Sequence, residues 1–419
     1  MSAKPLQKRM ETPSARGHAG LALALATLFF LFEFLARVAP STATEAIAGD
    51  LGLSRAGLGA FSSLFFWVYA PMQIVVGLLL DRWGARRFIL PAIAFCASGM
   101  ALVGLAPSGT LAGIGRLLTG LGASFAFVGA LYVVNHWFAP NRFALLSGLV
   151  NAVGMLGTAV GVVWLTALSE SVGWRQTFIG IAGFGAALFV LALFFYHDAP
   201  SAGDTETHSH PLGPLKQVVK SPQVWLLSLI GALIYMPINV YGGLWGNEEL
   251  TADHGLTAVS AETAVAMVFW GMAAGSVLWG ALSDALGHRK WIVFTGALCA
   301  TLAWGVVILG HTEQLWIVSA LLFLGGLFCG AQMLSFAMAK EGQDQSTVGT
   351  VTAFVNMIGI GAALVFQPLV GWLLDLTDGD HAKALLVIPI CLALAALLVL
   401  GLKEPEQPHL RSGRQKDLS

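Results

Sequence analysis

The sequence predicts an all-α polytopic membrane protein with twelve transmembrane helices, arranged as two related six-helix bundles. Of its 419 residues, 56% are hydrophobic and 11% are charged, whereas soluble domains carry roughly 25% charged residues. Apolar runs of about 20 residues, the length that crosses a bilayer, recur along the whole chain. A polar, glycine-containing turn that follows the second of these runs returns after the eighth, at the equivalent place in the second half.

Polar residues, glycines and prolines mark the ends of the apolar runs and divide the chain into twelve spans. An N-terminal tail (1–20) precedes the first bundle (21–196), a polar linker (197–222) leads to the second bundle (223–402), and a C-terminal tail (403–419) follows. The expected spans of the first bundle are 21–44, 57–79, 88–107, 110–133, 143–168 and 176–196. Those of the second bundle are 223–246, 261–283, 291–310, 314–338, 349–374 and 384–402.

The distribution of lysine and arginine predicts the orientation of the chain in the membrane. With the N-terminus inside, 17 of the 22 Lys and Arg residues fall in cytoplasmic segments. The exceptions are Arg55, Arg175 and Lys383 in outer loops, and Arg37 and Arg116 within spans. Cytoplasmic loops of membrane proteins carry an excess of positive charge. We therefore expect a multi-pass protein of the bacterial inner membrane with both termini in the cytoplasm.

The composition and the motifs argue against several function classes. The net charge is −1 and no basic patch is present, so we expect no nucleic-acid partner. The four cysteines stand in apolar segments without the spacing of a metal site, so no metal is expected. No nucleotide-binding loop or nucleophile–base motif is found. The sequence predicts neither an enzyme nor a cofactor.

The repeated turn reads GLLLDRWGARR (77–87) in the first half and GALSDALGHRK (280–290) in the second. Glycine allows a helix end to approach a neighbour closely, and an aspartate can accept hydrogen bonds from a helix N-terminus or pair with an arginine. Such a cluster can form in one conformation and break in another, which predicts a gating role. The simpler interpretation is that its basic residues only keep the loop inside. The predicted gating residues are Gly77, Asp81, Gly84, Arg86 and Arg87, and Gly280, Asp284, Gly287, Arg289 and Lys290.

On these two motifs, and on RLLTGLG (116–122), the chain resembles the major facilitator superfamily over nearly its whole length. The resemblance implies two six-helix bundles related by pseudo-two-fold symmetry, transport by alternating access, and a monomer. It also implies that the first, fourth, seventh and tenth helices line a central cavity. Two short stretches, FEFLARVAPS (32–41) and YGGLWGNEEL (241–250), resemble phagosomal nutrient carriers of intracellular bacteria. Such carriers import amino acids and related metabolites.

Two charges, Glu33 and Arg37, interrupt the first span. An ionised group in mid-membrane costs about 2.5–3.5 kcal/mol on insertion scales, which makes such a residue a candidate functional site. Because they are four residues apart, both lie on one helix face. Arg116 stands at a similar depth in the fourth span, and the resemblance implies that all three side chains converge on the cavity.

We hypothesise that Glu33 is the proton-coupling site and that Arg37 and Arg116 anchor the substrate. Two cations and one acid leave a positive site, and arginine forks match carboxylate geometry. Protonation of Glu33 would release Arg37 for the substrate. The alternative is a structural ion pair that locks the first helix to the fourth without touching substrate.

Neutral polar side chains are the remaining candidates for substrate contact, although helix–helix packing is an alternative role for each. We expect no acid or base deep in the spans of the second bundle. The site would then take its charge from the first bundle, and hydrogen bonding from the second. The candidates are Tyr69 and Gln73 in the second span, Tyr235 and Asn239 in the seventh, Gln332 in the tenth and Asn356 in the eleventh.

The preferred function is proton-coupled import of a small carboxylate-bearing or zwitterionic metabolite. The partners would be the solute, protons and the lipid bilayer. A proton-coupled exporter of the same fold is an alternative, although the fifth span (SGLVNAVGMLGTAVG, 147–161) lacks the Gly-Pro pair that resemblance to exporters would imply. A third alternative, from another class, is a membrane sensor that binds solute without moving it.

Overall fold

The computed structural model describes residues 13–138, 143–198, 213–310, 312, 314–341 and 345–403. These residues form helices and no strand. They fall into two compact units, which we call unit 1 (Met1–Ser209 with Gln367–Asp375) and unit 2 (His210–Phe366 with Leu376–Ser419). Residues 1–12, 199–212 and 404–419 of the predicted tails and linker lie outside the described residues.

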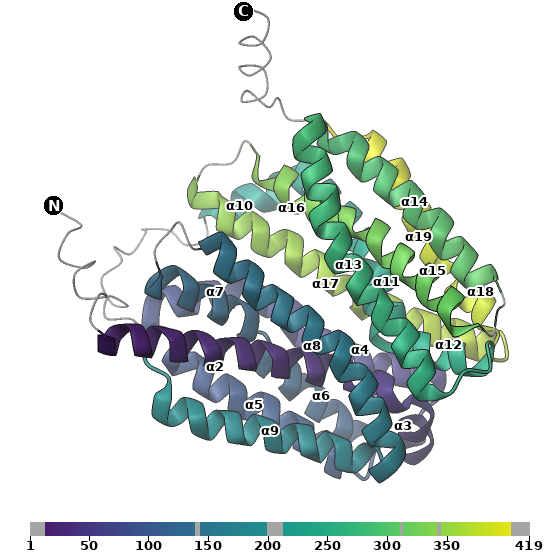
Figure 1. Ribbon diagram of the computed structural model, residues 1–419, viewed down its shortest axis with the longest axis horizontal. Helices are drawn as coiled ribbons and strands as arrows, with labels where there is room; N and C mark the ends of the chain where they lie inside the picture. Colours follow the sequence, from purple (N-terminus) through teal and green to yellow (C-terminus); the bar gives the residue numbers. More distant parts are fainter. Residues whose placement is uncertain are drawn as a thin grey trace, which may run out of the picture. The chain divides into compact units, whose positions relative to one another are not determined.

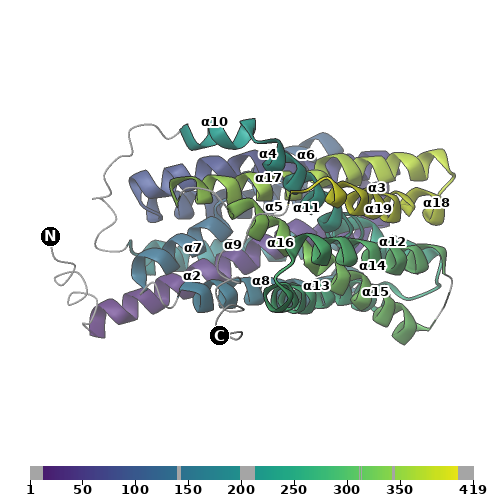
Figure 2. The same ribbon diagram turned by 90° about the horizontal axis from the view of Figure 1, so that it is seen from above.

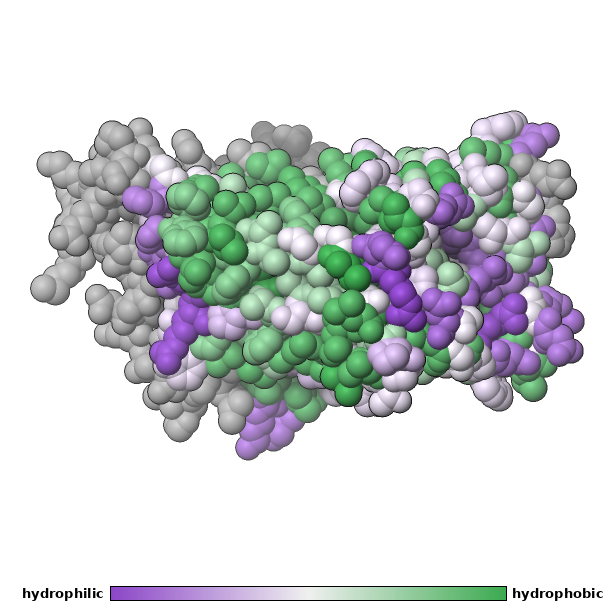
Figure 3. All heavy atoms as spheres, turned by 90° about the horizontal axis from the view of Figure 1, so that it is seen from below, coloured by the Kyte–Doolittle hydropathy of each residue, from purple (hydrophilic) through white to green (hydrophobic). Residues whose placement is uncertain are grey.

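Twelve helical stretches among the described residues are long and apolar enough to cross a membrane, which confirms the predicted fold class. The face seen in Figure 3 carries a broad area of hydrophobic side chains, with hydrophilic ones gathered mainly toward its two ends. The stretches are Gly17–Leu51, Arg55–Gly77, Arg86–Leu105, Gly109–Trp137, Val153–Val172, Trp174–Phe195, Pro222–Ala252, Ala258–Ser283, Arg289–Leu309, Leu315–Lys340, Gly349–Leu376 and His381–Leu400.

In unit 1, α2 packs against α7, α8 and α9, while α5 packs against α6 and α9 (Figure 1). The Gln367–Asp375 end of α17 also belongs to this unit, where the Asp375 carboxylate accepts from the backbone N–H groups of Arg55 (3.1 Å) and Ala56 (2.9 Å). That carboxylate therefore caps the start of α4. The elements are α2 (Pro13–Val38), η1 (Ala39–Ala43), α3 (Thr44–Leu51), α4 (Arg55–Trp83), α5 (Arg86–Leu105), α6 (Gly109–Ala123), α7 (Ala126–Trp137), α8 (Phe143–Val172) and α9 (Trp174–Phe195).

In unit 2, α13 and α15 form the most extensive helix pair, and α14 packs against α19 (Figure 2). Most of α17 lies in this unit. The elements are α10 (Gly213–Lys220), α11 (Pro222–Val240), η3 (Tyr241–Trp245), α12 (Gly246–Ala252), α13 (Ala258–Leu286), α14 (Arg289–Leu309), α15 (Leu315–Cys329), η4 (Gly330–Gln332), α16 (Met333–Lys340), α17 (Gln345–Leu376), α18 (His381–Leu385) and α19 (Val387–Leu400).

The second span of each unit begins and ends in the same way. The hydroxyl of Ser54 accepts from a backbone N–H in the first turn of α4, and that of Thr257 does so in α13. Each helix then stops at a glycine with positive φ, Gly84 (+80°) and Gly287 (+70°), a conformation that other residues adopt only with strain. The same number of residues separates Ser54 from Thr257 and Gly84 from Gly287, as the internal repeat predicts.

The first and fourth spans of each unit are interrupted helices. In unit 1, α2 passes through the 3₁₀ turn η1, which contains Pro40, into α3, and a short break separates α6 from α7. In unit 2, α11 widens after Pro237 into the π-helical turn η3 before α12, and η4 separates α15 from α16. Proline removes a hydrogen-bond donor from the ladder, and π-turns within helices are frequent at functional sites. In each unit the interrupted helices carry most of the residues predicted to bind proton or substrate.

Candidate functional site

A buried ion pair lies at the C-terminal end of α2. Arg37 Nε donates to Glu33 Oε1 at 2.8 Å, and Arg37 Nη2 donates to the same oxygen. Nη2 also donates to the hydroxyl of Tyr69 on α4, at 3.1 Å. Glu33 is fully buried and Arg37 is 8% exposed. The structure thus brings three of the predicted site residues together.

Aromatic rings surround the guanidinium of Arg37. Its Cζ lies 4.5 Å from the ring centre of Phe34, 5.0 Å from that of Tyr69 and 5.8 Å from that of Phe65. The rings of Phe65 and Tyr69 are themselves stacked, with centres 5.3 Å apart. The negative faces of aromatic rings stabilise a cation without neutralising its charge. This surrounding therefore leaves Arg37 able to attract an anion.

The second carboxylate oxygen of Glu33 has no donor among the described residues. Arg37 supplies the hydrogen bonds that the described residues make to Glu33, and they end on Oε1, while the buried Oε2 accepts none. An unsatisfied buried acceptor is costly, and Oε2 is the position of this carboxylate that is open to a proton. Protonation would also remove the charge that attracts Arg37. The geometry allows Glu33 to exchange a proton and thereby to change the pairing of Arg37.

Arg116 on α6 is fully buried and makes a different set of contacts. Its Nη1 donates to Ala36 O at 2.8 Å, and its Nη2 donates to Arg37 O and Ser62 O, each at 3.2 Å. All the hydrogen bonds that Arg116 makes to described residues therefore end on main-chain carbonyls of α2 and α4. Its guanidinium ties three helices together beside the Glu33–Arg37 pair.

Gly120 explains how α6 comes close enough to α4 for these bonds. A Cβ at Gly120 would lie 2.1 Å from Phe65 O, so only glycine permits the observed approach. The ring of Phe65 then lies 5.0 Å from Cζ of Arg116. Phe65 is therefore an aromatic neighbour of both arginines.

Gln73 lies one turn after Tyr69 on α4 and is buried. Its Nε2 donates to Tyr69 O at 3.3 Å and to Ser124 O at 3.5 Å. Ser124 stands in the break between α6 and α7. Gln73 thus belongs to the same side of α4 as Tyr69 and contacts an interrupted helix.

The predicted polar residues of unit 2 lie on three elements. Asn239 and Gln332 are buried on α11 and η4, while Tyr235 on α11 and Asn356 on α17 are half-buried. The elements α11 and η4 pack together, and a Cβ at Gly231 of α11 would lie 3.8 Å from Gln332 Nε2. Gln332 is therefore held beside the middle of α11.

The first repeated turn is fixed to the end of α9 by Asp198, which the sequence analysis did not identify. Its carboxylate accepts from the backbone N–H groups of Ala85 (3.0 Å) and Arg86 (2.8 Å). Arg86 Nη2 in turn donates to Leu193 O at 2.7 Å. The predicted aspartate of this turn, Asp81, has a side chain outside the described part of the structure.

The second repeated turn is fixed to the end of α19 in a parallel way. Lys290 Nζ donates to Leu400 O at 2.8 Å and to Leu402 O at 2.9 Å. Arg289 Nη1 forms an ion pair with Glu341 Oε1 at 2.8 Å, a partner that was also not predicted. As in the first turn, the side chain of the aspartate, Asp284, is not described.

Unit 2 contains buried acids near the ends of its seventh and eighth spans, which the sequence analysis did not identify. Glu248, Glu249 and Glu262 are 6%, 3% and 0% exposed. The π-turn and the short α12 carry the first two into the interior of unit 2, whereas a continuous span would have ended before them. The available sequence signal was a histidine in each of two polar stretches, TADHGLT (251–257) and TDGDHAK (377–383).

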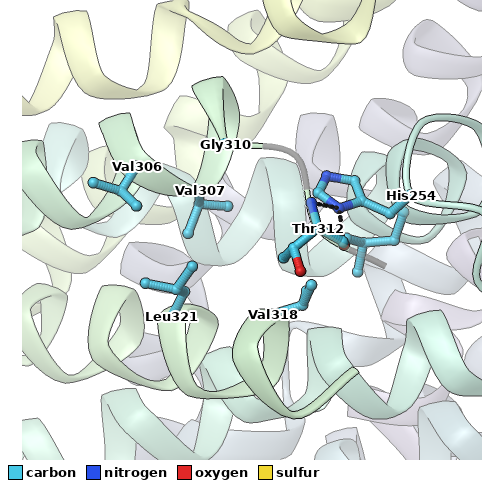
Figure 4. Close-up of a pocket in the computed structure, with 8 residues that line it drawn as sticks. His254, Val306, Val307, Gly310, Thr312, Val318 and Leu321 are labelled. Carbon is cyan, nitrogen blue, oxygen red and sulfur yellow. Dashed lines mark hydrogen bonds between the residues drawn. The ribbon is translucent and has the colours of Figure 1, made fainter. Parts of the chain in front are cut away.

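His254 joins α12 to the connection between α14 and α15. Its Nε2 lies 3.1 Å from Glu249 Oε1. Its Nδ1 lies 2.7 Å from Thr312 O, a contact drawn in Figure 4. The hydrogen bond to Glu249 raises the pKa of His254 to about 8, with a smaller contribution from the Thr312 carbonyl, while burial acts in the opposite sense. The ring forms one wall of a small pocket whose remaining lining, including Val307 and Leu321, is mostly apolar.

Comparison with known proteins yields one family. The profile that describes the Major Facilitator Superfamily matches residues 23–248 and again residues 227–419. A relative from Cupriavidus necator, described as "Probable sulfoacetate transporter SauU", is 23% identical over 93% of this chain and 96% of its own length. The "Membrane sensor protein UhpC" of Salmonella typhimurium is 27% identical over 91% of this chain and 90% of its own.

A solved structure shares the fold. It is a bacterial homolog of the human lysosomal transporter Spinster, in an inward-facing and occupied conformation. The TM-score is 0.74 and the sequence identity 16%, over 95% of this chain and 97% of that one. At this sequence identity, the match shows a shared fold alone.

Proposed function

Since this chain belongs to the Major Facilitator Superfamily, we propose that it is a proton-coupled importer of a small carboxylate-bearing or zwitterionic metabolite, working by alternating access. Membership confirms the family that the duplicated turn predicted and, with it, the prediction that the chain is not an enzyme. The observation that carries the proposal is the Glu33–Arg37–Tyr69 cluster, where one acid with an open oxygen holds one arginine.

Glu33 and the substrate compete for the same arginine in this proposal, and a proton on Glu33 decides the competition in favour of the substrate. When Glu33 is ionised, two donors of Arg37 are committed to its Oε1. When Glu33 takes a proton, the attraction falls and the guanidinium can turn its paired donors to a substrate carboxylate. The aromatic rings keep the cation stable during the exchange. The name of the Cupriavidus relative, a sulfoacetate transporter, fits a carboxylate-bearing solute.

Arg116 takes a positioning role in this proposal instead of the substrate contact expected from sequence. Its two terminal nitrogens are both committed to carbonyl oxygens of α2 and α4. By holding Ala36 and Arg37 at the backbone, it fixes the depth and direction of the Arg37 side chain. Tyr69 and Gln73 of unit 1, and Tyr235, Asn239, Gln332 and Asn356 of unit 2, stay proposed substrate contacts. The ten residues of the repeated turns stay proposed gating residues.

We place the transporter in a bacterial inner membrane as a monomer, with both termini in the cytoplasm. The excess of lysine and arginine in the segments on that side supports this orientation. The repeated turns would then face the cytoplasm, where proton-driven import ends.

Transport by Glu33→Gln tests the proposal. A thermal-shift screen of sulfoacetate, other carboxylates, amino acids, purines and sugar phosphates first supplies a solute. In proteoliposomes with an inward proton gradient, wild type should accumulate that solute, whereas E33Q should bind it and exchange it without accumulation. Glu45→Gln, at an exposed carboxyl on α3, is the matched control. Normal accumulation by E33Q would refute the coupling role, and net outward flux by wild type would identify an exporter.

A sensor is the second candidate, because one relative with similar coverage carries that name. A sensor would bind solute with the same residues and move none. Purified protein that shows a solute-dependent thermal shift, but no uptake or exchange in proteoliposomes, would favour this function over transport.

A further inference from the structure

The contact between α12 and α13 contains a buried carboxyl group that the proposed function does not use. Glu262, in the second turn of α13, is 0% exposed. Asn247 of α12 donates through its Nδ2 to Glu262 Oε2 at 2.6 Å and to Ala258 O at 2.9 Å. The other oxygen of Glu262, Oε1, is buried and has no hydrogen-bond partner among the described residues.

Glu262 differs from the neighbouring acids in having no basic partner. Glu249 Oε2 accepts a hydrogen bond from the Tyr241 hydroxyl at 2.6 Å, and Glu249 Oε1 lies 3.1 Å from His254 Nε2. Glu248 faces His381 Nε2 at 3.6 Å. Glu262 makes no ion pair with any described basic residue. Within the described part of the chain, the single donor to Glu262 is the neutral side-chain amide of Asn247.

This surrounding favours the neutral form of Glu262. An ionised carboxylate in a low-dielectric interior is stable only when it is paired or richly hydrogen-bonded, and one amide donor does not provide that. The titratable groups that face this region add no positive charge at Glu262. Tyr241 of η3 is close enough to interact electrostatically with it, and Glu249 of α12 is an acid held by its own histidine.

We propose that Glu262 binds a proton in this conformation and is a second proton site, separate from Glu33. The proton sits on the carboxyl group, and Asn247 stabilises the resulting acid through Oε2. Loss of the proton would leave a charge that only water or a cation could satisfy, so α12 would have to separate from α13. Proton occupancy at Glu262 is thereby linked to the packing of α12, the last segment of the interrupted seventh span.

Infrared spectroscopy of the purified full-length protein in lipid tests the protonation of Glu262 directly. Protonated carboxylic acids and carboxylates absorb in separate regions, so each glutamate can be assigned by its glutamine variant. We expect the spectrum at neutral pH to contain an acid C=O band that Glu262→Gln removes and that Glu33→Gln and the exposed control Glu45→Gln leave in place. Loss of carboxylate bands in E262Q instead of the acid band would overturn the proposal.

Asn247→Leu gives an independent assignment that does not require E262Q to fold. Removing the single donor to Oε2 should shift the same acid band to higher frequency without removing it, because the acid loses a hydrogen bond. If no acid band responds to either substitution, Glu262 is not protonated and the proposal fails. The outcome is independent of transport, so it leaves the role proposed for Glu33 untouched.

Discussion

At the scale of single residues, His254 makes the folding stability depend on pH. His254 lies outside the membrane-spanning stretches, and its hydrogen bond to Glu249 raises its pKa from 6.5 to about 8. A raised pKa means that the folded state holds the proton more tightly than the unfolded state does. The stabilisation is complete below about pH 6.5 and is lost as the pH rises through about 8.

We therefore predict that His254→Gln removes a pH-dependent part of the stability. After discounting for solvent screening, the wild-type pair contributes about 1 kcal/mol at low pH. The melting temperature of wild type in detergent should fall relative to that of H254Q between pH 6.5 and 8. His197→Gln, at an exposed histidine, is the control and should follow wild type. Parallel curves for wild type and H254Q would contradict the assignment of the pair.

At the scale of elements, the interrupted helices carry the ionisable side chains of the candidate site. Contacts with neighbouring helices fix the position of the interrupted segments. Arg116 is the clearest case, since one side chain of α6 binds carbonyl oxygens at the end of α2 and in α4. Lysine at this place could reach only part of this set, because it lacks the planar fork.

We predict that Arg116→Lys lowers the free energy of unfolding by about 2–3 kcal/mol, the cost of lost charge-assisted hydrogen bonds in a buried place. The solute affinity of the molecules that stay folded should change little. Arg37→Lys should do the reverse, weakening solute binding about tenfold with a smaller effect on stability. Melting temperatures and equilibrium binding of the two variants separate these roles.

Arg175→Lys is the control for this pair of variants, because the half-exposed Arg175 also donates to main-chain carbonyls, Gly104 O and Ala106 O. The R175K substitution should change neither the melting temperature nor the solute affinity appreciably. A tenfold loss of solute affinity in R116K with unchanged stability would indicate that Arg116 contacts the substrate.

The sequence predicted these elements well and their partners poorly. Glu33, Arg37 and Tyr69 could be found because charge inside an apolar span is rare, and i,i+4 spacing brings the pair together. Asp198 and Glu341 could not be found in the same way, because their contacts depend on where the ends of helices far apart in the sequence meet. The acids of α12 were missed because a π-turn extends the seventh span beyond the point at which polar residues ordinarily end a helix.

At the scale of the whole molecule, the sequence predicts the direction in which the chain crosses the membrane, and labelling can measure it. In a variant whose four cysteines are replaced, Lys383→Cys and Lys403→Cys place single thiols at exposed residues on opposite predicted sides. A membrane-impermeant maleimide should label K383C in intact cells and K403C only after lysis. The opposite pattern would reverse the predicted orientation, and with it the direction of proposed import.

The matching ends of α4 and α13 bear on the origin of the protein. Ser54 and Thr257 cap the two helices, and Gly84 and Gly287 end them with a positive φ, yet the partners that fix the two turns differ. A carboxylate holds the first turn and an ammonium group holds the second. Duplication of one six-helix segment predicts this combination, in which the capping hydroxyl and the terminal glycine keep the same offset in both halves while the side chains around them differ.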